Sequence, residues 1–308
     1  MIGDIARLLR GAGMRAVGAL PVVGPTLAPR PHLDVDGSVV FITGAARGLG
    51  AEIARQAHAR GAHVALVGRR LEPLQELAGQ LGERAKAFQA DVTDAEALQR
   101  AADGAVEAFG GIDVVVANAG IAPPSRTVAT MTEQDFEHTV DVDLLGQWRT
   151  ARATMPSIIE RRGHLIFVGS IYAFFNGVLA APYAVSKAGV EQLARTLRVE
   201  LAGHGATAGI AYLGFIDTDL ATEVFADDHA AAIRRAVPGF ITAPMSVADA
   251  AAAVLSGIGR RAPRVSAPGW VAPLLAVRSL TTAVMDQVLL TNPDVAQAID
   301  EAEATTGE

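Results

Sequence analysis

Short apolar segments alternate with helical segments over residues 37–266, and this alternation constrains the fold more than any other feature of the sequence. The apolar segments are continuous runs such as Leu165–Val168, which are typical of strands buried on both faces in a parallel sheet. Seven strands are predicted, at residues 38–42, 63–67, 85–89, 112–116, 165–168, 208–213 and 264–266. We therefore predict an α/β fold of three layers, in which helices cover both faces of a doubly wound parallel sheet.

The chain is predicted to form a single domain with an extension at each end. Residues 1–36 form an N-terminal arm, residues 37–266 form the main domain with a lid at about 215–245, and residues 267–308 form a C-terminal helical extension. The arm would pack on the body of the protein or on a neighbouring subunit, with a peripheral membrane contact as the alternative. The extension carries a helical apolar stripe at 277, 280, 284 and 288, and three roles stay open for it. It would cover a pocket, extend an oligomer contact or touch a membrane surface.

Composition and motifs exclude several classes of function. The formal net charge of −7 offers no positive surface to DNA or RNA, so no nucleic-acid partner is expected. Cys is absent and the seven His show no ligand spacing, so we predict no metal site and no thiolate chemistry. The G-x-S-x-G and G-x-x-x-x-G-K-[ST] motifs are also absent. No apolar run reaches the roughly 18 residues that span a membrane, and we expect a cytoplasmic protein, with a membrane-peripheral location through the termini as the alternative.

A glycine-rich segment, Thr43–Gly50, joins the first predicted strand to a helix at 51–60. At such a turn the backbone N–H groups and the helix dipole bind the phosphates of a nucleotide cofactor. Glycine is required because a Cβ would block the approach of the cofactor to the backbone. The candidate cofactor-binding residues of this segment are Gly44, Arg47, Gly48, Leu49 and Gly50.

The second predicted strand is followed by arginine where many NAD sites have an acidic residue that holds the ribose 2′-hydroxyl. Arg69 and Arg47 would bind the 2′-phosphate of NADP through charge-assisted hydrogen bonds. NADP(H) is therefore the predicted cofactor. NAD(H) is the alternative if the two arginines are only solvated surface residues.

Three polar residues follow the strand Leu165–Val168 and can share one crevice. Ser170 lies at the carboxyl end of the strand, where open α/β sheets bind their ligands. Tyr183 and Lys187 are four residues apart on the next predicted helix, so their side chains lie one above the other, although for this pair alone chance placement is the alternative. A cation about 4 Å from a phenolate stabilises it by roughly 4 kcal/mol at an effective dielectric of about 20. Tyr183 would then transfer a proton near neutral pH, while Ser170 hydrogen-bonds the reacting oxygen.

Taken in order, these motifs resemble those of the short-chain dehydrogenase/reductase family, whose fold is Rossmann-like. The resemblance covers residues 37–266, and the family's T-G-x-x-x-G-x-G matches Thr43–Gly50 in full. Ser170 and Tyr183-x-x-x-Lys187 match in order and spacing. The N-N-A-G element is present at 117–120 with one substitution, and the P-G-x-x-x-T element has Leu213 in place of its proline.

The resemblance implies further cofactor contacts. In the family, an Asp-Val pair holds the adenine, the N-N-A-G element lies beside the cofactor, and the Tyr and Lys contact the nicotinamide ribose. The residues at these positions are Asp91, Val92, Asn118, Ala119, Gly120, Tyr183 and Lys187, with Ile216 and Thr218 near the nicotinamide carboxamide.

Asp143 departs from the family pattern, which usually has Asn at this position in a bent helix whose backbone holds a water joined to the lysine. A carboxylate only accepts hydrogen bonds, whereas an amide also donates them. Asp143 would pair with Lys187 and partly cancel its effect on Tyr183, or would itself pass protons, so we include it among the candidate catalytic residues. If the backbone carbonyl holds the water, the substitution changes little, and we expect activity to survive.

The resemblance implies an NADP-preferring short-chain alcohol dehydrogenase or carbonyl reductase. Phenylalanines at 174, 175, 215, 225 and 240 favour a small apolar alcohol or carbonyl substrate, with a place in the core or at a subunit interface as the alternative. Members of the family commonly pair through their long helices, so a homodimer or homotetramer is expected. The alternative function is a cofactor-binding regulator or scaffold with weak or no turnover, because Asp143 replaces the family Asn.

Overall fold

The computed structural model describes residues 32–219, 221–222 and 227–304. The chain divides into two units, Met1–His32 and Leu33–Glu308, and all the elements below belong to the second. Most of the predicted N-terminal arm, and Phe225 of the predicted lid, lie outside the described residues. Leu33 and Val35 are buried in the core, and the Leu33 N–H donates to the Gly259 carbonyl over 2.8 Å. The packed body therefore begins at Leu33.

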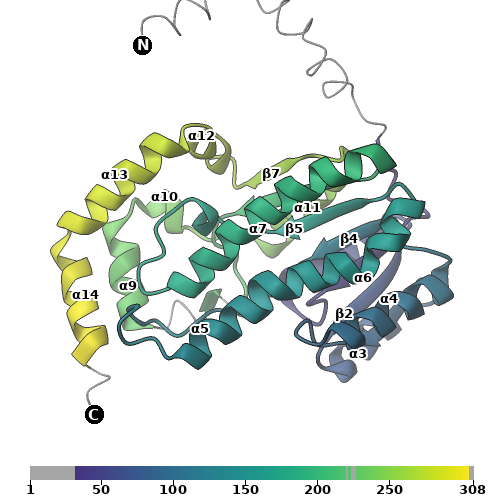
Figure 1. The fold of residues 1–308 in the computed structure, drawn as a ribbon, viewed down its shortest axis with the longest axis horizontal. Helices are drawn as coiled ribbons and strands as arrows, with labels where there is room; N and C mark the ends of the chain where they lie inside the picture. Colours follow the sequence, from purple (N-terminus) through teal and green to yellow (C-terminus); the bar gives the residue numbers. More distant parts are fainter. Residues whose placement is uncertain (1–31, 220, 223–226, 305–308) are drawn as a thin grey trace, which may run out of the picture. The chain divides into compact units, whose positions relative to one another are not determined.

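Seven parallel strands form a single sheet in the order β3-β2-β1-β4-β5-β6-β7 (Figure 1). They are β1 Val39–Thr43, β2 His63–Gly68, β3 Ala85–Gln89, β4 Val114–Ala117, β5 His164–Val168, β6 Thr207–Leu213 and β7 Arg264–Ala267. The chain works outward from β1 to β3 and then returns to the other side of β1 at β4. The predicted doubly wound, Rossmann-like sheet is confirmed.

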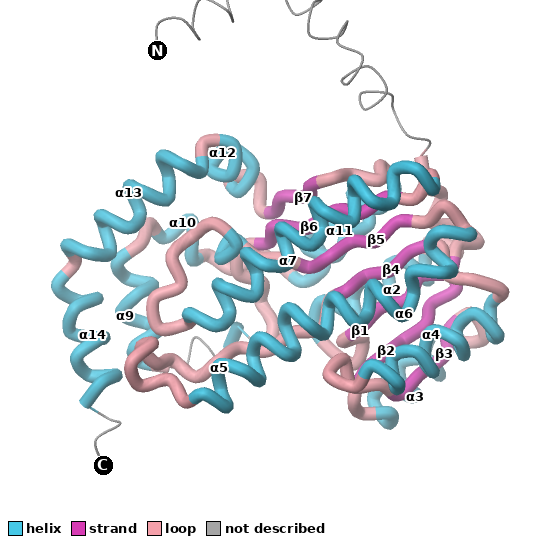
Figure 2. Tube along the Cα trace, in the orientation of Figure 1, coloured by secondary structure: helices cyan, strands magenta, loops and turns pink. Residues whose placement is uncertain are grey.

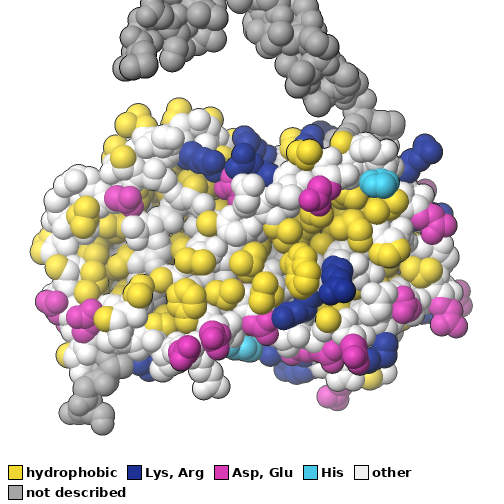
Figure 3. Space-filling model, in the orientation of Figure 1, with side chains coloured by type: hydrophobic (Ala, Val, Ile, Leu, Met, Phe, Trp, Pro, Cys, Tyr) yellow, Lys and Arg dark blue, Asp and Glu magenta, His cyan; other side chains and the backbone are white. Residues whose placement is uncertain are grey.

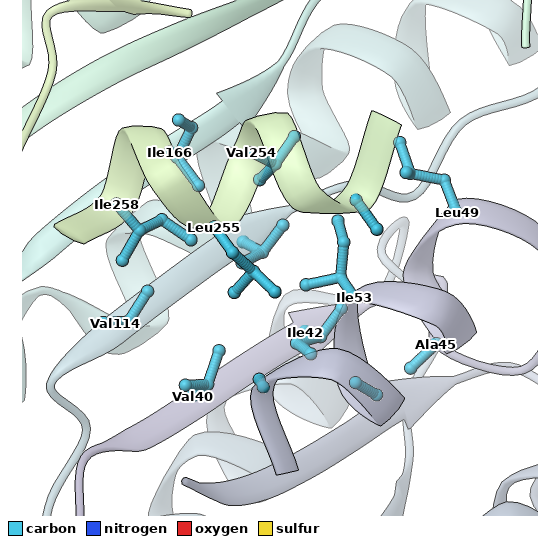
Figure 4. Close-up of a cluster of buried hydrophobic side chains, with 14 of the residues drawn as sticks. Val40, Ile42, Ala45, Leu49, Ile53, Val114, Ile166, Val254, Leu255 and Ile258 are labelled. Atoms are coloured by element: carbon cyan, nitrogen blue, oxygen red, sulfur yellow. The ribbon is translucent and has the colours of Figure 1, made fainter. Parts of the chain in front are cut away.

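Helices cover both faces of the sheet (Figure 2). One face carries α2 Gly48–Ala59, α3 Leu71–Leu81 and α11 Val247–Gly259, and the other carries α4 Ala95–Phe109, α6 Gly146–Glu160 and α7 Ala181–Glu200. Successive residues of β1 alternate between the two layers, because side chains on a strand point to opposite faces. Val40 and Ile42 pack against α2 and α11 in the cluster shown in Figure 4, whereas Phe41 packs in the opposite cluster. This two-sided burial explains why the strands are continuous apolar runs.

Side-chain caps fix the starts of two of these helices. Asp94 accepts hydrogen bonds from the N–H groups of Glu96 and Ala97 at the start of α4. The Ser246 hydroxyl caps α11 by accepting from the Asp249 N–H.

The long helix predicted after β4 consists of three segments. Helix α5, Glu133–Val140, is followed by a π turn, η3, at Asp141–Leu145 and then by α6. The bend that the family resemblance implied takes the form of this π turn. Such turns are rare and often lie at functional sites.

The remaining elements follow the carboxyl ends of β5, β6 and β7. They are η4 Ile171–Ala173, η5 Leu201–His204, α9 Asp228–Ala236, α10 Gly239–Thr242, α12 Val271–Ala276, α13 Arg278–Thr291 and α14 Pro293–Ala304. The apolar stripe predicted for the extension lies on α13 and just before it, and its members Val277, Leu280, Val284 and Val288 are exposed. Within the described ranges, no helix is both long and apolar enough to cross a bilayer.

Candidate active site

The candidate site residues gather where the strands end. The cofactor candidates follow β1, β2, β3, β4 and β6, and Ser170 follows β5. Tyr183 and Lys187 lie in the first two turns of α7, and Asp143 lies in the π turn. Since all the strands are parallel, their carboxyl ends form a single edge of the sheet, which is where ligands bind in open α/β folds.

The glycine loop leaves its backbone open to a ligand. Gly44 and Gly48 have φ values of +66° and +55°, which side chains with a Cβ rarely adopt. A Cβ on Gly50 would come within 2.4 Å of the Gly44 carbonyl oxygen, so the loop folds back closely on the start of α2. Leu49 is buried beneath it and packs in the core. The loop therefore presents backbone rather than side chains before the N-terminus of α2, as a pyrophosphate requires.

Asn118 fastens the end of β4 to this loop. Its side-chain amide donates to the Thr43 carbonyl over 2.9 Å, and its backbone N–H donates to Thr43 Oγ1 over 3.1 Å. The Ala119 N–H donates to the same hydroxyl over 3.3 Å. These bonds show that Asn118 joins the ends of two strands, β4 and β1. A Cβ on Gly120 would lie 3.4 Å from Asp143, so this turn also reaches the π turn.

The two candidate arginines each lie beside an acidic residue. Arg47 Nη1 is 3.2 Å from Asp219, and Arg69 Nε is 3.9 Å from Asp91, with all four side chains at least one-third exposed. Such exposed pairs contribute little to stability, about 0–1 kcal/mol, so either guanidinium can turn to an anionic ligand at small cost. Asp91 is held separately by the Thr93 N–H and hydroxyl, at 2.9 and 2.8 Å. Val92 is buried behind it.

The segment after β6 is tied down through its backbone. Ile216 pairs with Met245 in an isolated parallel bridge, and Met245 donates to the Phe215 carbonyl over 2.9 Å. Thr218 Oγ1 accepts from the Ala221 N–H at 3.3 Å, and its methyl lies near the position of a Gly48 Cβ. The end of β6 and the glycine loop thus face each other.

Ser170 and Tyr183 are linked through Tyr172, a residue that the sequence analysis did not single out. The Ser170 hydroxyl accepts a hydrogen bond from the Tyr172 N–H over 3.3 Å. The Tyr172 ring meets the Tyr183 ring edge to face, with centroids 5.6 Å apart, and also meets Phe215 at 6.3 Å. Burial, with Tyr183 adding to it, raises the pKa of Tyr172 to about 12, so this hydroxyl stays protonated. Tyr172 therefore forms a neutral wall beside the Tyr183 ring.

Lys187 lies under the Tyr183 ring and is almost completely buried, with 3% of its surface exposed. Its Nζ is 5.0 Å from the centroid of the Tyr183 ring and donates to the Val168 carbonyl over 3.5 Å. Gln147 donates to the same carbonyl over 3.2 Å. The end of β5 therefore holds both the serine and, through one carbonyl, the ammonium group.

Asp143 is fully buried and forms an ion pair with Lys187, as the sequence predicted as one of its alternatives. Its Oδ2 is 3.4 Å from Lys187 Nζ, and its Oδ1 accepts from the Ile121 N–H over 2.8 Å. Burial lowers the pKa of Lys187, but the charge of Asp143, followed by that of Tyr183, outweighs it, so the pKa rises. Burial raises the pKa of Asp143 against the opposing effects of Lys187 and the Ile121 N–H. The pair keeps the lysine charged inside the protein.

We expect Asp143→Asn to turn over at least as fast as the wild type. The amide oxygen can still accept from the Ile121 N–H, while removal of the carboxylate leaves the Lys187 charge to act on Tyr183 alone. Because the pKa of Asp143 is raised, the wild-type carboxyl gains its proton at a higher pH than an ordinary one, so the two rates should converge as the pH falls. Steady-state rates across pH test this. A loss of more than tenfold in the variant would contradict it.

The phenylalanines expected to face the substrate divide between two environments. Phe174 is buried in the core, with its ring 6.0 Å from Tyr212, so the alternative of an ordinary core residue holds for it. Phe215 instead contacts Tyr172 beside the site, and Phe240 packs on Trp270 of the extension. The aromatic ring next to Tyr183 is therefore that of Tyr172, and Phe215 packs on Tyr172.

Comparisons with known proteins identify the family of this fold. A family model described as short chain dehydrogenase matches residues 38–229. The 3-oxoacyl-(acyl-carrier-protein) reductase of Escherichia coli is 30% identical over 226 residues, covering 73% of this chain and 92% of the relative. The 3beta-hydroxysteroid dehydrogenase 1 of Eggerthella lenta is 35% identical over 227 residues, covering 71% and 87%.

Solved structures are similar over the same region. A short-chain type dehydrogenase/reductase from Mycobacterium marinum has a TM-score of 0.67 at 26% identity, covering 76% of this chain and 94% of the other. A short-chain dehydrogenase/reductase from Burkholderia phymatum, in complex with NAD, shares the fold with a TM-score of 0.71 at 22% identity, covering 85% and 98%. The chain belongs to the short-chain dehydrogenase/reductase family of oxidoreductases.

Proposed function

We propose that the protein is an NADP-preferring alcohol dehydrogenase or carbonyl reductase that interconverts an apolar alcohol with its ketone or aldehyde. The observation that carries the proposal is the buried Lys187 ammonium beneath the Tyr183 ring, paired with Asp143 and bound to the Val168 carbonyl at the end of the strand that Ser170 follows. A solvated, chance Tyr-Lys pair would not bury its lysine, because an unpaired buried ammonium is costly.

The residues of the strand ends fit a nicotinamide dinucleotide. The glycine loop supplies an open backbone at a helix N-terminus, and added Cβ atoms on Gly44 or Gly50 would collide with Asn118, Ala119 or the loop itself. Asp91 and Val92 would hold the adenine, and Ile216 and Thr218 would hold the carboxamide. When bound, such a cofactor accepts or supplies the hydride.

Side chains of the protein itself would then carry out the proton transfer. The Ser170 hydroxyl would hydrogen-bond the oxygen of the reacting carbonyl and orient it. The Tyr183 hydroxyl would give its proton to that oxygen in reduction and take it back in oxidation. The Lys187 ammonium would stabilise the phenolate left on Tyr183, and Asp143 pairs with that ammonium. Tyr172 and Phe215 would limit the access of water on one side.

The preference for NADP(H) is proposed from Arg47 and Arg69, whose side chains are both more than half exposed. In Arg69→Ala the NADPH dissociation constant should rise about tenfold, since a charge-assisted hydrogen bond contributes about 1.5–3 kcal/mol. The NADH dissociation constant should change little, because NADH lacks the 2′-phosphate. Fluorescence titration with both cofactors measures this. Equal weakening of both would mean that Arg69 is not a phosphate ligand.

The substrate is proposed to be apolar because the Tyr172 ring lies beside Tyr183 and Phe215 packs on Tyr172. A relative named as a steroid dehydrogenase, 35% identical, supports an apolar alcohol or ketone. Relatives named as reductases of an acyl carrier protein substrate support the carbonyl chemistry.

The test is oxidation of NADPH and NADH by the purified protein against a panel of apolar ketones and aldehydes, with the reverse reaction on the alcohols. Turnover with a faster rate on NADPH supports the proposal. Tight cofactor binding without turnover in either direction across the panel would contradict it. That result would favour the regulator in which Asp143 silences the site, since Asp143 is indeed paired with Lys187.

We also propose that the protein is a homodimer or homotetramer that pairs through α6 and α7. Hydrophobic side chains gather over these helices in Figure 3, and Leu145, Trp148, Val185 and Val199 are 39%, 43%, 52% and 75% exposed. Trp148→Glu should convert the assembly to smaller particles, because a charge placed in an apolar interface is costly. Light scattering measures the mass. A monomeric wild type would contradict the proposal.

A further inference from the structure

We propose that the C-terminal extension forms the outer wall of the substrate site, with α14 holding α9 in place and α13 anchored to α7. This inference rests on the proposed function, because it concerns the substrate of the same site. Helices α9, α13 and α14 lie next to one another, beyond the end of the sheet from which β6 and β7 lead into them (Figure 1). Of the three roles left open by the sequence, the contacts support the covering of a pocket.

Helix α9 belongs to a segment that leaves the site and returns to it. Ile216, which precedes α9, pairs with Met245, which follows α10, in an isolated parallel bridge. Phe215, next to Ile216, contacts the Tyr172 ring, which in turn contacts Tyr183 edge to face. After α9 the chain continues into α10, whose Ile241 is buried in the same core cluster on which Phe215 packs. A substrate beside Tyr183 would therefore have α9 on its outer side.

Helix α9 is held by α14 rather than by the core on the sheet. Ala232 is the buried residue of α9, and α14 buries Val295, Ala298 and Ala302, which are spaced three and four residues apart and so share one face. None of these four residues belongs to the two clusters that fill the layers on the sheet. The two helices pack on each other, and His229 of α9 lies 3.9 Å from Glu301 of α14.

Helix α13 is fixed to the segment that carries the proposed catalytic residues. Arg278, its first residue, donates to Glu191 over 2.7 Å, and Glu191 lies one turn after Lys187 on α7. Asn176, in the segment between Ser170 and Tyr183, donates to Asp286 of α13 over 3.0 Å. Glu191 is 5% exposed, so this is a partly buried ion pair rather than a loose surface contact. The extension thus joins both sides of the site, α7 with its preceding segment and α9.

The decisive comparison is Ala298→Asp against Ala296→Asp. Ala298 is 2% exposed and lies on the buried face of α14, whereas Ala296 is exposed on the same helix. Both variants add the same charge, but only Ala298→Asp places it in the contact between α14 and α9. In Ala298→Asp we expect the KM for a bulky apolar ketone to rise about tenfold or more, because substrate contact with α9 is lost. The NADPH dissociation constant should change by less than about twofold, and Ala296→Asp should leave both values near the wild type.

Hydrogen exchange of α9 amides supplies a readout independent of turnover. Exchange at 228–236 should accelerate in Ala298→Asp while α2 and α7 stay protected. Faster exchange with an unchanged KM for every substrate would contradict the proposal that the extension forms a wall of the substrate site. Unchanged exchange would contradict the proposal that α14 holds α9 in place. Absence of turnover in the wild type would instead contradict the proposed function. The exchange experiment would then still test whether α14 holds α9 in place.

A second pair of variants decides the question if Ala298→Asp does not fold. Asp286→Ala removes the acceptor of the Asn176 bond, whereas Asp286→Asn keeps an oxygen in its place. The alanine variant should raise the KM with little change in cofactor affinity, and the asparagine variant should not. Equal kinetics of the two variants and the wild type would overturn the anchoring role of α13.

Discussion

Replacing Tyr183 by phenylalanine is expected to lower kcat by about 10³-fold, because a positioned general acid or base contributes about 10²–10⁴. The aromatic ring remains, so its contact with Tyr172 and its place over Lys187 should persist. NADPH should bind with nearly unchanged affinity, since the glycine loop and the strand ends keep their geometry. Steady-state kinetics with an apolar ketone and fluorescence titration with NADPH measure the two effects separately.

The chain offers a matched control in Tyr212, which lies in β6 and is buried in the core. Tyr212→Phe also removes a single buried hydroxyl, and it should leave kcat within about threefold of the wild type because Tyr212 lies in the core rather than among the candidate site residues. Equal losses in the two variants would mean that the tyrosine hydroxyls support folding rather than proton transfer. Retention of full activity in Tyr183→Phe would remove Tyr183 from the chemistry altogether.

Lys187→Met is expected to lower the free energy of unfolding by about 3–5 kcal/mol, because it leaves the buried carboxylate of Asp143 without its partner. Methionine nearly matches the volume of the lysine stem, so the loss reports the charge rather than a cavity. The pKa of Asp143, already raised by burial, should rise further, and the penalty should shrink as the pH falls and the carboxyl takes a proton. Urea unfolding at several pH values measures this.

A second substitution separates the charge from the packing. In Lys187→Met with Asp143→Asn, neither charge remains, and the amide can still accept from the Ile121 N–H. This double variant should regain at least half of the lost stability while staying inactive. Lys86, the other lysine of the chain, is exposed, and Lys86→Met should change stability by less than about 0.5 kcal/mol. No recovery in the double variant would show that Lys187 supports the fold through packing alone.

The sheet and the placement of the site at its edge could be predicted because both depend on local patterns. A run such as Leu165–Val168 reports burial on both faces, and the residue after it must lie at the carboxyl edge whatever the rest of the chain does. The four-residue spacing of Tyr183 and Lys187 likewise fixed their relative position on α7. The pairing of Asp143 with Lys187 was predicted as one alternative, and the structure confirms that one.

Other features depend on contacts between distant segments, and the sequence does not contain them in a local form. The π turn lies within one continuous helical region, and the sequence Asp141–Leu145 has no feature that distinguishes such a turn from a regular helix. Tyr172 stands among apolar residues and is indistinguishable from core until its contacts with Ser170 and Tyr183 are seen. Phe174 shows the converse. Its position between Ser170 and Tyr183 suggested a substrate contact, but its neighbours place it in the core.

Chain length can change at the π turn without turning α6 away from the sheet. In a regular helix the loss of one residue rotates everything beyond it by about 100°, which would swing Gln147 off the Val168 carbonyl. The wide turn at Asp141–Leu145 holds one residue more than an α-turn, so deletion of one residue there would leave a plain helix with α5 and α6 in their present orientations. A chain one residue shorter in this segment is therefore compatible with the same fold, and it would lose only the local widening of the helix at Asp143.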